Sequence, residues 1–304
     1  IIKMKFLLYL ICYFIYPFSF LFLRNEKKWA FGSSRGSFND NAKYLFIYVS
    51  NVNPNINAAW LSPSRAVVKQ IREMGLKAYY IFSARGAWFA LSSKYWFFNS
   101  YTSDIMFCLS GKAKRINLWH GVGLKRIEFN ITTGDLAKLY VDRKIKNCFF
   151  HPQVFQRPDY ILSPSANQTQ MLTKAFRIPE TQCLNYGYPR NEILTCSEKE
   201  RMRHIQKYES KDVIDIISKI KLFEKTYIYM PTWRDSQRNI FSQSMNLADL
   251  NFILKDKNEL LLLKPHSNVI VDAKDKESFS NIIFLDSKLD SYPILPYTDV
   301  LITD

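Results

Sequence analysis

The chain has few of the residues that build metal or redox centres. It contains only four histidines, and its five cysteines include no Cys-x-x-Cys pair. No Asp-x-Asp pair and no His/Asp cluster has the spacing of metal ligands, so the sequence predicts no required metal. Several of the cysteines lie in apolar stretches, and we interpret them as reduced thiols of a cytosolic compartment.

Acidic residues are also scarce. The 27 Asp and Glu residues face 42 Lys and Arg residues, which gives a formal net charge of +15. Such a balance predicts an anionic partner: nucleic acid, anionic lipid or a phosphate-rich substrate. Nucleic acid is the weakest of the three, because the sequence shows no recognition helix, zinc finger or RNA-binding aromatic motif. A nicotinamide enzyme is disfavoured too, since no Gly-x-Gly-x-x-Gly follows the first predicted strand.

One long uncharged run begins near the N-terminus. Residues 6–23 carry no charge, are rich in Phe and Tyr, and are flanked on both sides by Lys and Arg. The run is just long enough to cross a bilayer, but Pro17 would kink it, and no small-residue cleavage site follows. We therefore expect residues 1–25 to associate with the cytoplasmic face of the membrane, in a peripheral or monotopic way. The alternative is a buried first helix of the following domain.

Apolar runs alternate with amphipathic stretches along the rest of the chain, which is typical of parallel sheets covered by helices. The first seven predicted strands are Lys28–Ser33, Ala58–Leu61, Lys77–Ser83, Asp104–Leu109, Ile116–Trp119, Tyr160–Ser163 and Cys183–Tyr186. A charged helical tract over 197–223 follows, and a second alternation with four apolar runs begins at Thr226. We predict an α/β fold with two Rossmann-like domains, residues 26–195 and 196–304, with the active site in a cleft between them.

The two ends of the sequence lead to two further predictions. The chain ends at Asp304, directly after a predicted interior strand that a helix should cover, so we expect the second domain to be truncated. At the other end, Met4 is a candidate for the natural start.

Four segments place polar groups suited to an anion directly after an apolar strand. They are His120-Gly121 with Lys125, Pro189-Arg190, Pro231-Thr232-Trp233-Arg234, and Lys264-Pro265-His266. Arg binds phosphate through a two-pronged fork, Lys binds it as a point charge, and His exchanges a proton near neutral pH. Alternatives remain at single positions: His120 as a turn cap, Arg234 in an ion pair with Asp235, and Trp119 as a plain core aromatic.

These segments carry a resemblance. "INLWHGVGLK", "YGYPRNEIL", "YMPTWRDS", "LLLKPHSN" and "PYTDVLITD", in this order, resemble the CDP-glycerol glycerophosphotransferase family of teichoic-acid and capsule polymerases. The resemblance covers roughly 28–304. It implies a GT-B-like fold at the inner membrane and transfer of glycerol phosphate, or a related polyol phosphate, from a CDP-activated donor to a hydroxyl, with release of CMP. The acceptor would be a polyol-phosphate or glycan polymer or its lipid-linked primer.

The resemblance also implies residue roles. His120 would be the general base, and His266 would hold the donor phosphates, so both count as catalytic. Arg190, Pro231, Thr232 and Lys264 match donor-binding positions, and the strand-end pattern adds Gly121, Arg234 and Pro265. Mg²⁺ would enter only with the donor diphosphate. The family continues after "DVLITD" with Tyr-Ser-Ser, whereas this chain ends there. Two alternatives stay open: a GT-B glycosyltransferase using a nucleotide sugar, and a non-catalytic membrane-bound fragment.

Overall fold

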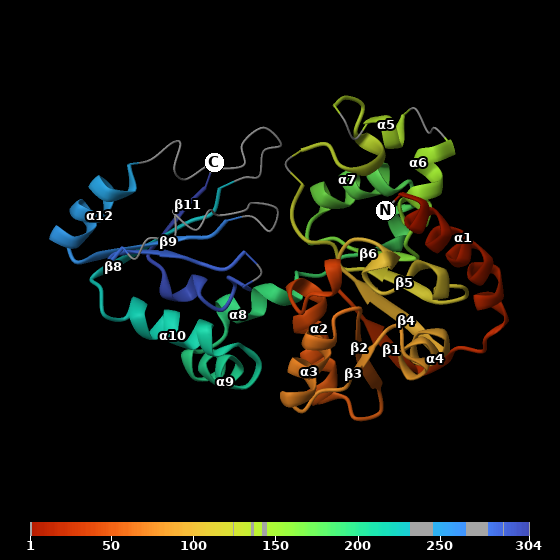
Figure 1. Cartoon of the computed structure of the whole chain (residues 1–304), viewed down its shortest axis with the longest axis horizontal. Helices are drawn as coiled ribbons and strands as arrows, with labels where there is room; N and C mark the ends of the chain where they lie inside the picture. Colours follow the sequence, from red (N-terminus) through yellow and green to blue (C-terminus); the bar gives the residue numbers. More distant parts are fainter. Residues whose placement is uncertain are drawn as a thin grey trace. The chain divides into compact units, whose positions relative to one another are not determined.

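The computed structural model describes residues 2–123, 125–134, 137–141, 145–231, 246–265, 279–287 and 289–303. The chain divides into two compact units, Ile1–Arg190 and Asn191–Asp304, and each is considered by itself (Figure 1). The sequence placed the boundary after residue 195. Residues 191–195 lie in the second unit because the Arg201 guanidinium donates hydrogen bonds to the carbonyl oxygens of Ile193 and Cys196, both at 2.9 Å.

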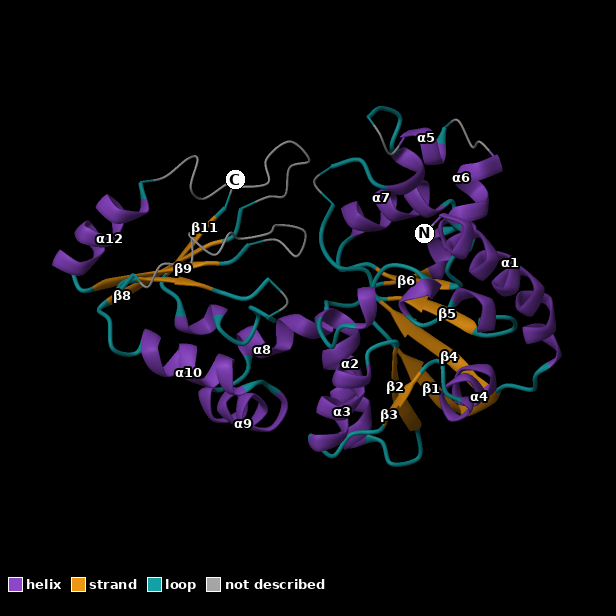
Figure 2. Cartoon of the chain, in the orientation of Figure 1, coloured by secondary structure: helices purple, strands orange, loops and turns teal. Residues whose placement is uncertain are grey.

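The first unit is built on a parallel sheet with the strand order β3-β2-β1-β4-β5-β6-β7. Its strands are β1 (Asn25–Phe31), β2 (Asn57–Ser62), β3 (Ala78–Tyr80), β4 (Ser93–Phe98), β5 (Lys114–Asn117), β6 (Tyr160–Leu162) and β7 (Cys183–Leu184). Its helices are α1 (Ile2–Phe18), α2 (Asp40–Val52), α3 (Arg65–Glu73), α4 (Ala84–Ser92), α5 (Ala137–Tyr140), α6 (Ile145–Phe150) and α7 (Ala166–Phe176). Figure 2 shows α2 and α3 on one side of this sheet and α4 and α1 on the other.

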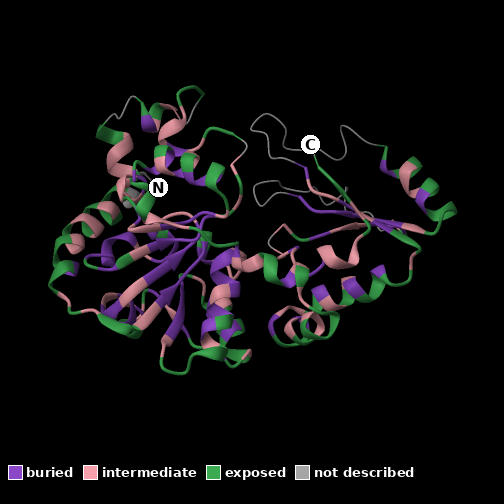
Figure 3. Ribbon diagram, turned by 180° about the vertical axis from the view of Figure 1, so that it is seen from behind, coloured by how far each residue is buried: buried purple, intermediate pink, exposed green. Residues whose placement is uncertain are grey.

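The side chains of the central strands alternate between these two faces, as the pleat requires. Ala30 is in register with Ala59 and Trp96, and these three pack in one cluster with α4 and the inner side of α1. The next residue, Phe31, points to the opposite face and stacks on Phe97 with ring centroids 4.8 Å apart. Both faces are therefore buried, and Figure 3 shows the strands of this unit largely in the buried colour.

Most predicted strands are confirmed with small shifts in their ends, and one is wrong. Asp104–Leu109 was predicted as a strand but forms two 3-10 turns, η3 (Thr102–Asp104) and η4 (Phe107–Leu109). The Asp104 carboxylate accepts hydrogen bonds from the backbone N–H groups of Asn99 and Ser100, which closes a turn instead of extending the chain. The strand of this region is β4, which the sequence analysis missed.

The N-terminal segment packs against the first unit along one side. On α1, Phe6 stacks on Phe149 at 5.1 Å, and the Tyr13 hydroxyl donates to the carbonyl of Phe149 at 3.1 Å. Arg24 then fixes the end of the segment, donating to the carbonyl oxygens of Ala90 and Leu109, each at 2.7 Å. None of the described helices is long and apolar enough to cross a membrane. The segment thus has a packed side and an exposed side.

The second unit has a four-stranded parallel sheet in the order β10-β9-β8-β11. Its elements are α8 (Glu192–Thr195), α9 (Glu198–Tyr208), α10 (Lys211–Ile220), β8 (Lys225–Tyr229), α12 (Leu247–Asp256), β9 (Glu259–Leu263), β10 (Ile282–Phe284) and β11 (Val300–Ile302). Leu260 and Leu262 pack with α9 and α10, whereas Leu261 and Leu263 pack with α12. The predicted α/β class with two parallel sheets is confirmed.

Candidate functional site

The first unit has a topological switch point between β1 and β4. The chain builds outward from β1 through β2 to β3 on one side, and from β4 through β5 to β7 on the other. Open α/β sheets bind ligands at the carboxyl ends of the strands that flank such a point. Asn99 follows β4 directly and joins the two halves, because its side chain donates to Ser33 Oγ at 2.9 Å and accepts from the N–H of Ala42 at 3.0 Å.

The backbone after β5 is forced into an unusual conformation that presents His120. Trp119 has φ of 52°, in the left-handed region that a large side chain avoids. Two asparagines hold it there: Asn117 Oδ1 accepts from the Trp119 N–H, and Asn41 Nδ2 donates to the Trp119 carbonyl, both at 2.8 Å. The Trp119 side chain is 4% exposed and packs on Phe176, so its interpretation as a core aromatic is confirmed. Strain held by several contacts is typical of functional sites.

One nitrogen of His120 is committed to the backbone. Its Nδ1 lies 3.2 Å from the carbonyl oxygen of Asn99 and 3.4 Å from Ser100 Oγ. A carbonyl oxygen can only accept, so Nδ1 carries the proton of the neutral ring and Nε2 carries the lone pair. The residue is exposed at the edge of the sheet. An imidazole in this arrangement has a basic nitrogen that can take a proton from a hydroxyl bound beside it.

A buried carboxylate supports the peptide group that His120 contacts. Asp104 Oδ2 accepts from Asn99 N–H at 3.1 Å and from Ser100 N–H at 2.9 Å. Burial raises the pKa of Asp104 to about 7, although the backbone hydrogen bonds oppose this. Asp104 therefore fixes the strand-end turn whose carbonyl orients His120.

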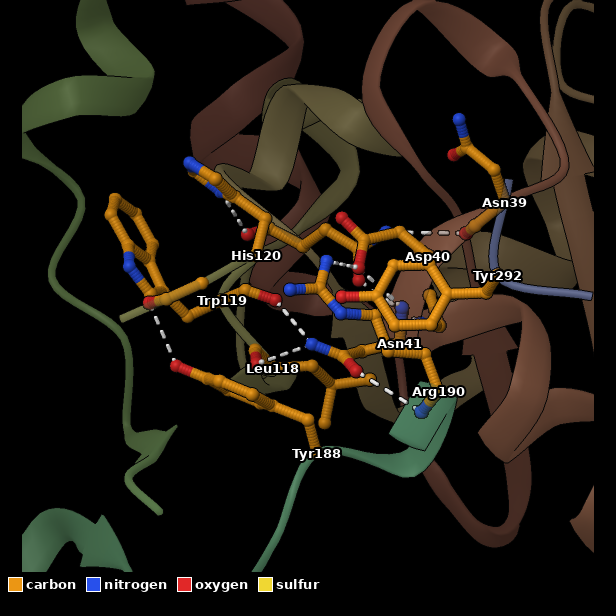
Figure 4. A network of polar contacts seen from close by, with 12 residues as sticks. Asn39, Asp40, Asn41, Leu118, Trp119, His120, Tyr188, Arg190 and Tyr292 are labelled. Carbon is orange, nitrogen blue, oxygen red and sulfur yellow. Dashed lines mark hydrogen bonds and ion pairs between the residues drawn. The ribbon is translucent and has the colours of Figure 1, made fainter. Parts of the chain in front are cut away.

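Asn41, at the start of α2, links three chain segments (Figure 4). Its side-chain nitrogen donates to the carbonyl groups of Leu118 and Trp119, and its side-chain oxygen accepts from Arg190 N–H at 3.3 Å. The Arg190 guanidinium in turn pairs with Asp40 at 2.6 Å. His120 and Arg190, predicted from separate motifs, thus belong to one network.

The glycines after His120 allow close packing of the loop. Gly121 accepts a hydrogen bond from the Tyr188 hydroxyl at 2.8 Å through its carbonyl, near Arg190. At Gly123 an added Cβ would lie 2.7 Å from Met171 Sδ, so a larger residue there would require the end of the Met171 side chain on α7 to move. Beyond the loop, the Glu128 carboxylate accepts from the hydroxyls of Tyr101 at 2.6 Å and Tyr140 at 2.9 Å. Burial raises the pKa of Glu128, and this clamp joins the loop to the segment beside Ser100.

In the second unit, the described part of the predicted site is centred on Lys264. Lys264 and Pro265 follow β9, and Pro231 follows the adjacent β8, so the three lie at one edge of the sheet. The Lys264 ammonium is buried and donates to the carbonyl oxygens of Asp286 at 3.0 Å and Ser287 at 2.7 Å. Burial lowers its pKa to about 8, although Asp286 and Asp290 oppose this. At least two of its three N–H bonds therefore hold the turn after β10.

Three predicted site residues, Thr232, Arg234 and His266, lie outside the described residues. Lys125 is among the described residues, and its role beside His120 stays a prediction. Where the chain is described, no group of three His, Cys, Asp or Glu side chains is placed to hold a metal ion.

The sequence analysis missed Asp40, Asn41, Asn99 and Asp104. The Asn39-Asp40-Asn41 run before an amphipathic stretch is a signal for a helix start, and polar residues there usually serve as caps. Nothing local shows that Asn41 reaches a loop far along the chain.

Comparison with known proteins agrees with these motifs. A family model described as CDP-Glycerol:Poly(glycerophosphate) glycerophosphotransferase matches residues 15–304. A teichoic acid poly(glycerol phosphate) polymerase of Staphylococcus epidermidis is 24% identical over 280 residues, covering 88% of this chain and 36% of the relative. A teichoic acid glycerol-phosphate transferase of Staphylococcus aureus is 26% identical over 215 residues, covering 65% of this chain and 51% of the relative. This chain thus spans about a third to a half of their lengths.

Among solved structures, the wall teichoic acid polymerase TagF matches with a TM-score of 0.71 and 24% identity, over 92% of this chain and 66% of that one. A UDP-GlcNAc 2-epimerase from Neisseria meningitidis matches with a TM-score of 0.54 and 10% identity, over 91% of this chain and 77% of that one. These likenesses bear on the fold alone, and they confirm the predicted GT-B-like class.

Proposed function

Because the chain belongs to the CDP-glycerol:poly(glycerophosphate) glycerophosphotransferase family, we propose that it transfers glycerol phosphate, or a related polyol phosphate, from a CDP-linked donor to a hydroxyl. The acceptor would be a polyol-phosphate or glycan polymer or its lipid-linked primer. The observation that carries the proposal is the contact between His120 Nδ1 and the Asn99 carbonyl at the switch point of the sheet. It directs a basic nitrogen outward where an acceptor hydroxyl can bind.

In the proposed reaction, Nε2 of His120 takes the proton of the acceptor hydroxyl as its oxygen attacks the β-phosphorus of the donor. A new O–P bond forms, the P–O bond to the bridging oxygen breaks, and CMP leaves with that electron pair. Negative charge spreads over the phosphoryl oxygens during this step, so cationic groups that face them lower the barrier.

Donor binding is assigned to Gly121, Arg190, Pro231, Thr232, Arg234, Lys264 and Pro265, with His266 on the donor phosphates. The contacts of Lys264 support an ordering role for it, because the ammonium fixes the turn after β10 beside the Pro265 strand end. Gly121 and Arg190 share one network with His120. Mg²⁺ is not required and would accompany the donor diphosphate.

The proposal includes attachment to the cytoplasmic face of the membrane through α1. One side of α1 packs on Phe149 and Phe107, and the other exposes apolar side chains, among them Leu7 at 58% and Phe14 at 69%. A helix with one packed side and one apolar exposed side suits insertion into a membrane interface.

The test supplies the full chain with CDP-glycerol and a lipid-linked glycerol-phosphate primer, and measures CMP release and the mass of the product. We expect CMP release and growth of the primer by glycerol-phosphate units. Growth by sugar units from nucleotide sugars would favour the glycosyltransferase alternative. Binding of CDP-glycerol with no turnover would favour a non-catalytic fragment.

A further inference from the structure

A second basic surface lies in the first unit, away from His120. A pocket of about 540 Å³ forms between α3, β3 and the start of α4, and its lining includes Arg65, Lys69, Arg72, Arg85, Tyr79 and Tyr80. Glu73 is the one carboxylate in the lining, against four cations. We propose that this basic pocket binds a phosphodiester segment of the growing acceptor polymer. The inference rests on the proposed function, and it deepens that function by naming a subsite for the polymer.

The cations form a row. Arg65, Lys69 and Arg72 occupy positions i, i+4 and i+7 of α3, which places them on one helix face over ~10 Å. Val68 and Ile71 of α3 are buried, and Val68 also lines the pocket beside the row of cations. A row of charges along a helix matches an anion that repeats along a chain, whereas a single lipid headgroup offers one cluster of charge.

Within the described chain, the heads of Arg65 and Arg72 are held by groups other than carboxylates. The Arg65 guanidinium lies 4.1 Å from the centre of the Tyr80 ring, and Arg72 Nε donates to the Ala78 carbonyl at 2.9 Å. Stacking on a ring leaves the N–H edge of Arg65 open, and the Arg72 contact leaves its two terminal amino groups as donors. Among the described residues neither arginine forms an ion pair, and the Lys69–Glu73 pair is exposed and therefore weak. Such heads can donate hydrogen bonds to phosphate oxygens.

Two of the four cations of the pocket lie toward the same edge of the sheet as His120. Arg65 begins the helix that follows β2, and Arg85 lies in the first turn of the helix that follows β3. His120 follows β5, four places from β3 in the sheet, which corresponds to ~19 Å at ~4.8 Å per strand. A polymer whose terminal hydroxyl lies at His120 would bring an earlier phosphodiester to the pocket without leaving this unit.

The experiment compares Arg65→Gln/Arg85→Gln with a matched control, Lys199→Gln/Lys211→Gln, which removes two exposed cations from the second unit. The probes are a short and a long synthetic glycerol-phosphate oligomer. We expect roughly three- to tenfold weaker binding of the long oligomer to the pocket variant, since exposed charge pairs have modest energies. The control should bind it as the unchanged chain does. CMP release with the short oligomer should be the same in all three proteins.

Three results would overturn the inference: unchanged affinity for the long oligomer, an equal loss in the control, or a loss seen only with anionic lipid vesicles. If the double variant does not fold, Arg65→Lys retains the charge and loses the fork, and it should still weaken long-oligomer binding. A failure of the proposed function is distinguishable, because a chain that releases no CMP can still show pocket-dependent binding of the long oligomer.

Discussion

His120 and Asp104 hydrogen-bond to opposite ends of one peptide group. The Asn99 carbonyl lies 3.2 Å from His120 Nδ1, and the N–H of the same peptide, that of Ser100, donates to Asp104 at 2.9 Å. A carboxylate that accepts from the N–H polarises the peptide and strengthens the carbonyl as an acceptor. Asp104 therefore positions the proposed base through an intervening peptide, without touching substrate.

Asp104→Asn should lower kcat about tenfold with little change in KM, because the turn and the base lose their fixed orientation while the binding groups remain. Rates of CMP release at several acceptor concentrations separate the two constants. A change confined to KM would contradict the positioning role.

The same substitution should change how stability depends on pH. The raised pKa of Asp104, about 7 against an ordinary 3.8, means that the folded state holds this proton more tightly than the unfolded chain. The protonated Asp104 contributes at most ~4 kcal/mol to the free energy of unfolding. This contribution is complete below pH ~4 and is lost as the pH rises to about 7. Asp104→Asn should remove that component. Denaturant unfolding of both proteins from pH 4 to 8 measures it, and parallel curves would be inconsistent with the raised pKa.

The Arg190–Asp40 pair should contribute to the stability of the first unit. Both side chains are largely buried, the pair distance is 2.6 Å, and Asp40 has a left-handed φ of 63°. We expect Arg190→Lys to cost ~1–3 kcal/mol, because Lys lacks the planar fork. The cost should largely disappear in an Asp40→Asn background. Additive losses in this double-mutant cycle would show that the two side chains do not interact.

Lys264 should make the second unit more stable in alkaline solution. Its pKa is lowered to about 8 by burial, so between pH ~8 and ~10.5 the folded state loses this proton before the unfolded chain does. The contribution of Lys264 to the free energy of unfolding of the second unit therefore rises over that pH range, by at most ~3 kcal/mol. A neutral amine keeps two N–H bonds for the carbonyls of Asp286 and Ser287. Lys264→Met should lack the rise, and an identical rise in both proteins would contradict the assignment.

The exposed side of α1 should control membrane attachment. Leu7→Gln/Phe14→Gln removes apolar area from that side without touching its packed side, and should reduce flotation with anionic vesicles severalfold. A matched control is Leu222→Gln/Phe252→Gln, which changes two exposed apolar side chains of the second unit. Equal flotation of both variants would mean that α1 is only a packing helix.

Local patterns in the sequence were sufficient for most of the fold. Continuous apolar runs marked β2 and β9, as expected for strands buried on both faces. Such patterns also misled at one place: a strand was predicted at Asp104–Leu109, and the actual strand β4 was not predicted. Both stretches are apolar, and what separates them is the contact of the Asp104 carboxylate with two backbone N–H groups, which composition does not reveal.

The candidate site was likewise predicted only where local sequence motifs mark it. The motifs placed His120 and Arg190 after strands, because a strand end followed by glycine or proline is visible in the sequence. Asn41 was missed because its partners, Leu118, Trp119 and Arg190, come together only when the sheet forms. Contacts of this kind depend on strand order, which a single sequence does not specify.

The role of His120 as the general base is tested most directly by CMP release from CDP-glycerol, measured for the full chain and for its His120→Asn variant with the same primer. An asparagine side chain can donate a hydrogen bond to the Asn99 carbonyl, but it has no basic nitrogen to take the acceptor proton. We expect His120→Asn to lower kcat by ~10²–10⁴ and to retain its affinity for CDP-glycerol. Turnover by His120→Asn within a few-fold of the unchanged chain would contradict it.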